Sequence, residues 1–297
     1  MANIPVVFCF DKRIILGASV AIKSLIDSAN DDTTYDIRIF HSDIGVEDQK
    51  NITLLTKGTK HTIAFHYIDS NIFKGAPHNN MSWTELVYYR LLIPEILKEY
   101  DKVIYSDVDV MFKGDLSDVY NIDLTGYEMA AVPVEVNNKD TMICHTYFPE
   151  NTNDKIYISS FIVFNSKLMR EEKTVDKFFD VINKVNKRLR FYDLDTMNIA
   201  INRFLPISLK YGTFQSIMYN DDIKKANEYE FLKGVYSDEE LVNARENTIM
   251  IHYAGKMGKP WRMKKPYKDY QEYINKLPNE LRKYTFRDIR KRFFSKV

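Results

Sequence analysis

The sequence predicts an α/β fold in which helices cover a mostly parallel, mixed sheet. Apolar runs of strand length alternate with segments of helical periodicity through the first hundred residues. The first run, Ile4–Phe10, is continuously apolar, as parallel strands are when both of their faces are covered. The chain has 297 residues, 45% of them hydrophobic, so it is long enough to bury a large core.

The individual elements follow from periodicity along the chain, which is two in exposed strands and 3.6 in helices. The expected strands are Ile4–Phe10, Tyr35–Phe40, Thr62–Ile68, Lys102–Tyr105, Ile156–Phe164 and Thr248–His252. The expected helices are Ile14–Ile26, Glu47–Leu55, Thr84–Leu97 and one around Lys173–Lys187. Residues 211–247 show little periodicity and predict loops and short helices. We therefore expect a single Rossmann-like domain over residues 1–265 and a small helical appendage over residues 266–297.

Composition excludes several classes of protein. The net charge of +1 gives no electrostatic basis for binding nucleic acid. Cys9 and Cys144 are too few for a disulfide scaffold and fit a reducing compartment. No apolar run is long enough to span a membrane, and the first ten residues lack a basic leader. We expect a cytoplasmic protein.

The segment with the clearest chemistry is an apolar strand that ends in two acids, Asp107 and Asp109. Open α/β sheets bind ligands at the carboxyl ends of their strands. If the chain stays extended there, residues two apart point the same way and both can reach one ion. A hard cation such as Mn²⁺ or Mg²⁺ prefers oxygen ligands and can bridge a diphosphate. An isolated Asp-x-Asp pair, however, is also common on surface turns.

A second polar segment follows the last expected strand, which ends at His252. Two glycines after it would let the backbone pass close to a ligand. Lys256 and Lys259 offer cations for phosphate. The His252 imidazole could complete the metal shell, which would favour Mn²⁺ over Mg²⁺. Alternatively, His252 is a satisfied histidine beside a glycine turn.

Together these two segments resemble family 8 of the retaining glycosyltransferases. That family includes bacterial lipooligosaccharide galactosyl- and glucosyltransferases and, more distantly, glycogenin. The resemblance covers residues 4–265 and implies a GT-A type domain that binds a nucleotide sugar. Further matching positions are Phe10-Asp11, Ala21–Ser24, Tyr88–Leu91, and Asp193-Leu-Asp195 with Asn198.

The resemblance also implies a role for each matching residue. Asp11 would hold the uracil of UDP-galactose or UDP-glucose, and Arg90 would lie beside the donor sugar and the acidic cluster. Asp193 would bond the hydroxyls of the transferred sugar. The implied metal ligands are Asp107, Asp109 and His252, and the implied diphosphate-binding residues are Gly255 and Lys259. Without the resemblance, Arg90 could form a surface salt bridge, and Asp193 and Asp195 could be acids that complement a helix dipole.

Two positions depart from the family pattern. Leu194 stands where many relatives carry glutamine on the reacting face of the sugar, and Ser159 or Ser160 stands in a stretch where the family has asparagine. Leu194 offers no nucleophile, so a covalent route would need Asp193 or another carboxylate. We therefore expect a front-face route, in which the leaving diphosphate deprotonates the acceptor.

The expected partners are a UDP-sugar donor and a glycan or lipid-linked oligosaccharide acceptor. The segment Thr285–Phe294 interleaves aromatic residues with cations and predicts peripheral contact with an anionic membrane at its inner face. A solvated, frayed tail is the alternative interpretation.

Two other functions compete with transfer. The first is a relative that binds a UDP-sugar without transferring it, which Leu194 and the two serines would explain. The second is a phosphatase of the haloacid-dehalogenase type, because Asp107–Val110 fits its signature and Gly114–Asp118 imitates its later acidic motif. A hundred residues of α/β pattern precede the first motif, however, and the second follows it too closely.

Overall fold

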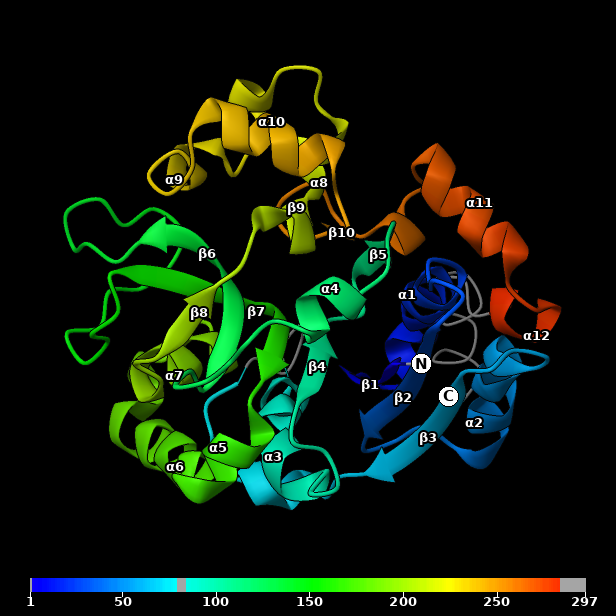
Figure 1. The fold of residues 1–297 in the computed structure, drawn as a ribbon, viewed down its shortest axis with the longest axis horizontal. Helices are drawn as coiled ribbons and strands as arrows, with labels where there is room; N and C mark the ends of the chain where they lie inside the picture. Colours follow the sequence, from blue (N-terminus) through cyan, green and yellow to red (C-terminus); the bar gives the residue numbers. More distant parts are fainter. Residues whose placement is uncertain (1, 79–83, 284–297) are drawn as a thin grey trace, which may run out of the picture.

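The computed structural model describes residues 2–78 and 84–283. Its centre is a seven-stranded sheet in the order β3-β2-β1-β4-β7-β6-β8 (Figure 1). The strands are β1 (Ala2–Cys9), β2 (Thr33–His41), β3 (Thr62–Tyr67), β4 (Val103–Ser106), β6 (Met129–Val136), β7 (Lys155–Phe164) and β8 (Phe204–Pro206). Strands β1 to β4 are mutually parallel, β7 runs antiparallel to both β4 and β6, and β8 is parallel to β6. The predicted fold class, an α/β domain with a mostly parallel mixed sheet, is confirmed.

A second, three-stranded sheet was not predicted. It consists of β5 (Val110–Phe112), β10 (Met250–His252) and β9 (Thr213–Phe214), with β10 in the middle. Strand β10 is antiparallel to β5 and parallel to β9. Because β5 follows β4 almost directly, this sheet brings β10, the last strand of the described residues, to the carboxyl end of a central strand.

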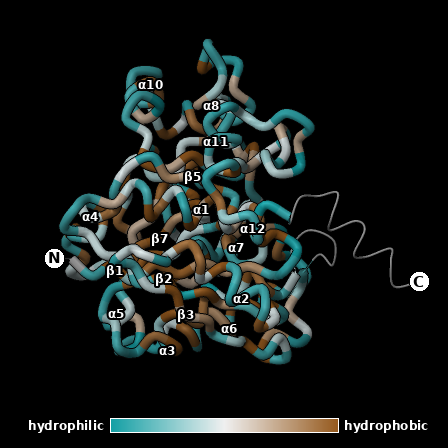
Figure 2. The backbone as a smooth tube through the Cα atoms, turned by 90° about the vertical axis from the view of Figure 1, so that its right-hand side faces the viewer, coloured by the Kyte–Doolittle hydropathy of each residue, from teal (hydrophilic) through white to brown (hydrophobic). Residues whose placement is uncertain are grey.

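Helices cover both faces of the large sheet and form two hydrophobic cores. Strand β1 alternates between them: Val6 and Phe8 belong to one core, and Val7 and Cys9 to the other. The first core includes α1 (Ile15–Asp27), α11 (Lys268–Lys276) and α12 (Asn279–Arg282). Apolar segments accordingly lie in the interior, where the strands run (Figure 2).

The second core includes helices from the middle of the chain, α3 (Ile93–Ile96), α5 (Ser166–Glu171), α6 (Thr174–Val185) and α7 (Asp193–Ala200). The remaining α-helices are α2 (Val46–Thr53), α4 (Ser117–Tyr120), α8 (Gln215–Tyr219), α9 (Tyr229–Leu232) and α10 (Asp238–Glu246). The 3₁₀ helices are η1 (Lys12–Ile14), η2 (Leu54–Thr56), η3 (Ser70–Phe73), η4 (Glu85–Leu92), η5 (Asn186–Arg188), η6 (Leu209–Tyr211), η7 (Ile223–Lys225) and η8 (Pro260–Arg262).

Two further differences from the sequence prediction have a local physical cause. The expected helix Thr84–Leu97 is a 3₁₀ helix, η4, followed by the single turn of α3, whose first turn contains Pro94. Strand β6 was not predicted, because its sequence contains small alanines and Pro133. That proline lies where the β6–β7 register shifts, so its missing N–H does not interrupt a regular ladder.

The end of the described chain packs against the first helix. Tyr270 in α11 and Leu281 in α12 are fully buried and belong to the same core as α1. The basic, aromatic segment Thr285–Phe294 lies outside the described residues. Within residues 2–78 and 84–283, no helix is long and apolar enough to cross a membrane.

A close contact joins α1 to the segment after β10. A Cβ built on Gly17 would lie 2.9 Å from Cε3 of the Trp261 ring. Gly17 is buried inside α1 and Trp261 is 9% exposed, so neither has much room to move. The absence of a side chain at Gly17 therefore allows the tryptophan to pack directly on the helix backbone.

Gly17→Ala is expected to lower the free energy of unfolding by about 1–2 kcal/mol. The gain in helix propensity, about 0.5–1 kcal/mol, is smaller than the roughly 1–3 kcal/mol cost of overpacking. Chemical denaturation would measure the change. Gly45→Ala is the control, since a Cβ there meets nothing within 4 Å. An equally or more stable Gly17→Ala protein would contradict the packing argument.

Candidate active site

Asp107 and Asp109 lie in the connection between β4 and β5. The chain bends at Val108-Asp109 and is not extended there, so the predicted reason for their convergence is wrong. The carboxylates nevertheless converge, and each retains exposure, 23% at the Asp107 side chain and 18% at that of Asp109. The Asp107 backbone N–H donates to the Ser160 carbonyl at 2.8 Å, which fixes the bend to β7.

His252, at the end of β10, lies next to this bend. Its Nε2 is 3.7 Å from Asp109 Oδ1, and the ligand atoms of His252, Asp107 and Asp109 all lie within 4.8 Å of one another. The imidazole is 5% exposed, and burial lowers its pKa, which favours the neutral form that coordinates metals. Two carboxylates and one imidazole form a donor set that suits Mn²⁺.

Lys259 places a cation beside the same carboxylates. Its ammonium forms an ion pair with Asp109 and donates to the Tyr253 carbonyl at 2.9 Å. Burial acts to raise the pKa of Asp109, but Lys259 and His252 outweigh it and lower the pKa below its ordinary value. Asp109 is therefore ionised, and an incoming divalent cation would meet a charged oxygen.

Arg90, in η4, forms a buried bridge between two acids. Its Nη1 lies 2.9 Å from Asp107 Oδ1, and its Nε lies 3.3 Å from Asp193 Oδ2. Burial acts to lower the pKa of Arg90, but Asp107 and Asp193 outweigh it and raise the pKa further. The guanidinium also donates to the Ser159 carbonyl at 2.8 Å and stacks 4.2 Å over the Tyr105 ring. Arg90 is 6% exposed, so it is not the surface salt bridge considered as an alternative.

Asp193 begins α7 and is buried, and burial raises its pKa to about 6 against the opposing effect of Arg90. Arg90 Nε donates its hydrogen to the Val87 carbonyl, so it attracts Asp193 only electrostatically. Within the described residues, Asp193 Oδ2 receives no hydrogen bond. This buried acceptor has unused capacity for a ligand hydroxyl.

Asp195 has a different function from Asp193. Two backbone N–H groups shortly before α7, those of Arg190 and Phe191, donate to Oδ2 of Asp195 at 2.7 Å. Asn198 bonds to both the N–H and the carbonyl of Tyr157 in β7. Asp195 and Asn198 therefore hold α7 in place, while Asp193 faces the charged cluster.

The turn after β10 contains Gly255, with φ of +83°, and Gly258, with φ of +84°. Gln215 Nε2 donates to the carbonyls of Ala254 at 2.7 Å and Gly258 at 3.2 Å, and so holds both ends of this turn. A Cβ at Gly255 would lie 2.4 Å from Glu228 Oε1. The Glu228 carboxylate accepts a hydrogen bond from the Ser216 hydroxyl beneath the turn.

Asp11 lies directly after β1, at the same edge of the sheet as Asp107. Its carboxylate accepts hydrogen bonds from the backbone N–H and Nε of Arg13, each at 2.8 Å. The side chain therefore caps η1. Arg13 Nη2 also lies 2.6 Å from Oδ2, so the lone pair that could accept a proton from a ligand is on Oδ1.

The contacts of several residues at the site were not predicted from the sequence. The Tyr105 hydroxyl donates to Asp107 Oδ1 at 2.6 Å, and Tyr105 is fully buried. Its position two residues before Asp107 on β4 is the only sequence signal for this contact. Ser159 bonds Arg90 through its carbonyl and also interacts with Asp193 through its side chain. The Ser160 hydroxyl is buried, and within the described residues it neither donates nor accepts a hydrogen bond.

The acidic motif that suggested a phosphatase is structural. Asp115 Oδ2 accepts from the Asn30 backbone N–H at 2.9 Å and from the Tyr35 hydroxyl at 3.1 Å. Its Oδ1 accepts from the Ser117 N–H at the start of α4. These bonds join the β5–α4 connection to β2, and they engage both oxygens of the carboxylate.

An α/β domain with clustered carboxylates and a glycine turn at the carboxyl ends of its strands has the layout of enzymes that bind nucleotides. The sequence matches glycosyl transferase family 8 over residues 5–265, and the chain belongs to that family. The family predicted from the sequence motifs is thus confirmed.

Several named proteins are similar to this chain in sequence, at 23–26% identity. A lipopolysaccharide 1,2-glucosyltransferase of Escherichia coli is 26% identical over 258 residues, which cover 84% of this chain and 71% of the relative. A lipopolysaccharide 1,3-galactosyltransferase of Salmonella typhimurium is 24% identical over 264 residues, which cover 86% and 72%. The general stress protein A of Bacillus subtilis is 23% identical over 286 residues, which cover 91% and 92%.

Solved structures share the fold. The bifunctional glycosyltransferase WbbM superposes with a TM-score of 0.75 and 24% identity over 97% of this chain and 51% of that chain. The galactosyltransferase LgtC, in complex with donor and acceptor sugar analogues, superposes with a TM-score of 0.74 and 18% identity over 95% and 100%. Both similarities support the GT-A type of fold predicted from the sequence.

Gly255→Ala is expected to destabilise the protein more than Gly258→Ala does. Both alanines would adopt a positive φ, at a cost of about 1–2 kcal/mol. Only the first would also displace Glu228 from Ser216, at a further cost of roughly 1 kcal/mol. Chemical denaturation of the two variants would measure the difference. Equal losses of unfolding free energy would contradict the proposed contact between the turn and Glu228.

Proposed function

We propose that this chain is a metal-dependent, retaining hexosyltransferase that moves galactose or glucose from a UDP-sugar to a surface glycan such as lipopolysaccharide. The observation that carries the proposal is the convergence of Asp107, Asp109 and His252 within 4.8 Å. The names of two relatives, both lipopolysaccharide hexosyltransferases, support the class of acceptor.

The metal ligands would be Asp107, Asp109 and His252. Around them, among residues 2–78 and 84–283, the three carboxylates of Asp107, Asp109 and Asp193 form ion pairs with two side-chain cations of Lys or Arg, Arg90 and Lys259. A divalent cation fits this excess of negative charge as well as the oxygen and nitrogen donors. When bound, Mn²⁺ or Mg²⁺ would supply positive charge to a diphosphate leaving group.

The chain itself would bind the rest of the donor. Lys259 is 31% exposed and could turn its ammonium toward a phosphate, and the exposed backbone at Gly255 would let that phosphate approach closely. Asp193 Oδ2 would accept a hydrogen bond from a hydroxyl of the sugar. Asp11, at the end of β1, would accept the imide proton of uracil.

The residues around the sugar favour a front-face route. Leu194 is 6% exposed and apolar, so it supplies no nucleophile. Arg90 holds Asp193 beside the sugar site as a hydrogen-bond acceptor. In this route the bond from the sugar to the diphosphate breaks first, and the leaving diphosphate oxygen takes the proton of the acceptor hydroxyl. That hydroxyl oxygen then bonds the sugar from the same face, so its configuration is retained.

Asp109→Asn is expected to reduce transfer at least roughly 100-fold and to weaken the dependence of the rate on Mn²⁺, because electrostatic stabilisation of the leaving group contributes several kcal/mol. The assay is release of UDP from a panel of UDP-sugars with Mn²⁺, followed together with thermal stabilisation by each donor. Asp118→Asn is the control, because Asp118 is exposed at the start of α4. Full activity and unchanged metal dependence in Asp109→Asn would overturn the proposed metal site.

A protein that binds UDP-sugar without transferring it is the second candidate. The observations that favour it are the apolar Leu194 and the unpartnered Ser160 hydroxyl close to the cluster. The same panel separates the two functions. Donor-dependent stabilisation without UDP release, across all sugars and acceptors, would establish the second candidate.

We also propose that the protein acts at the inner face of an anionic membrane through Thr285–Phe294. The sequence after Leu281 contains seven Lys or Arg residues and one acidic residue. Each cation near anionic headgroups contributes about 1 kcal/mol to binding. The full chain should therefore sediment with anionic liposomes, and a chain that ends at Leu281 should remain in solution. Equal sedimentation of both chains would exclude this role of the segment.

A further inference from the structure

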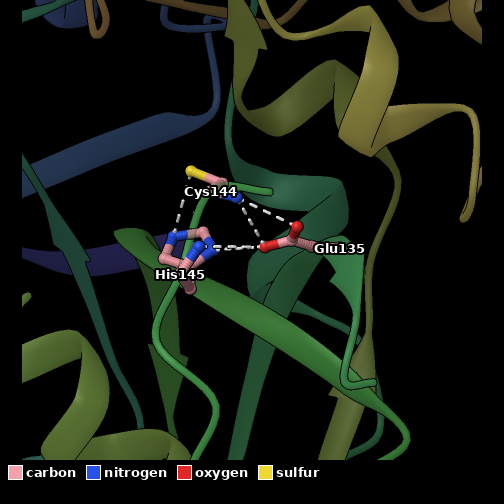
Figure 3. Close-up of side chains that lie close together, drawn as sticks. All are labelled: Glu135, Cys144 and His145. Atoms are coloured by element: carbon pink, nitrogen blue, oxygen red, sulfur yellow. Dashed lines mark hydrogen bonds and ion pairs between the residues drawn. The ribbon is translucent and has the colours of Figure 1, made fainter. Parts of the chain in front are cut away.

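Glu135, Cys144 and His145 form a second polar cluster, separate from the residues assigned above (Figure 3). Glu135 lies on β6, and the other two lie in the connection between β6 and β7. The side chains of Glu135 and His145 are almost fully buried, and Cys144 is partly buried. Their nearest ligand atoms lie within 4.8 Å of one another.

Both oxygens of the Glu135 carboxylate accept hydrogen bonds. It accepts from the backbone N–H groups of Ile143, Cys144 and His145, and from His145 Nδ1 at 3.2 Å. The three successive N–H groups surround the carboxylate and fix this part of the connection. The His145 ring also packs edge-on against Phe191, with the ring centroids 5.1 Å apart.

These contacts determine which nitrogen of the His145 imidazole is available to bind a ligand. Because Nδ1 donates its hydrogen to Glu135, Nε2 carries the lone pair. That nitrogen faces Cys144 Sγ at 3.6 Å. A carboxylate that orients an imidazole through its distal nitrogen is the usual outer-shell arrangement behind a histidine metal ligand.

The separation of the sulfur and the nitrogen matches the bite of one tetrahedral ion. Zn–S and Zn–N bonds of about 2.3 and 2.0–2.1 Å at a tetrahedral angle place the two ligand atoms about 3.5–3.6 Å apart. The 3.6 Å found here needs little rearrangement.

We propose that Cys144 and His145 bind a thiophilic divalent cation such as Zn²⁺ or Cd²⁺, with Glu135 as the orienting carboxylate and water at the open positions. The thiol proton is released to solvent as the sulfur–metal bond forms. The sulfur and nitrogen donors select a different ion from the oxygen-rich site at Asp107 and Asp109. The inference does not rest on the proposed transfer function.

The test is titration of the reduced full chain with Cd²⁺, followed by the ultraviolet charge-transfer absorption of a cadmium–thiolate bond. One Cd²⁺ per chain should produce the band, and Zn²⁺ should displace it. Cys144→Ser should abolish the band, and Cys9→Ala, which removes the other thiol, should retain it. Glu135→Gln should weaken binding roughly 10–100-fold, and His145→Gln, which removes a direct ligand, should weaken it more than Glu135→Gln does.

Further outcomes separate this site from the first one and from misfolding. Asp109→Asn should keep the band whether or not transfer is lost. A band that persists in Cys144→Ser, or that is unchanged in His145→Gln, would overturn the proposal. If a variant does not fold, the wild-type chain still decides: Zn²⁺ must slow alkylation of Cys144, as measured by mass spectrometry, and unchanged labelling would refute the site.

Discussion

The pairing of β5 with β10 is the constraint on which the active site depends. In this antiparallel register His252 lies opposite Val110, and the Tyr253 N–H donates to the Asp109 carbonyl at 2.8 Å. These bonds join segments more than 140 residues apart in sequence. Without them, the two acids would lie at the end of β4 with no imidazole, and the glycine turn would have no fixed position relative to them.

Arg90 and Lys259 partly offset the negative charge of the three clustered carboxylates. Three carboxylates in a partly buried cluster would repel one another strongly, since interactions between charges are stronger away from bulk water. Arg90 offsets this by contacting Asp107 and Asp193 at once, and Lys259 pairs with Asp109. Tyr105 supports the arrangement from below, with its ring under the guanidinium and its hydroxyl on Asp107. The acids are thus held apart in defined positions, with a remaining negative charge that suits a cation.

The sequence predicted the order of the early strands and helices because their apolar periodicity is strong. It did not predict β6, in which Pro133 and the alanines hide a strand signal that only pairing with β7 and β8 creates. Asp107 and Asp109 were found from their place after a buried strand. His252 was a candidate ligand from its own segment, but only the family resemblance favoured that interpretation over a satisfied histidine beside a glycine turn. The contacts of Ser159, Tyr105 and Glu135 depend on tertiary packing, for which a single sequence has no local pattern.

The position of Lys259 depends on the core around α1 rather than on the turn itself. The turn after β10 is exposed and contains two glycines with positive φ, so its own bonds define it weakly. Gln215, the first residue of α8, holds the turn. Two residues after Lys259, the ring of Trp261 packs on Gly17. Tyr253 and Tyr267, on either side of the turn, have their rings 6.1 Å apart in a stacked arrangement. Anchored at both ends in this way, the turn keeps the ammonium of Lys259 in its ion pair with Asp109.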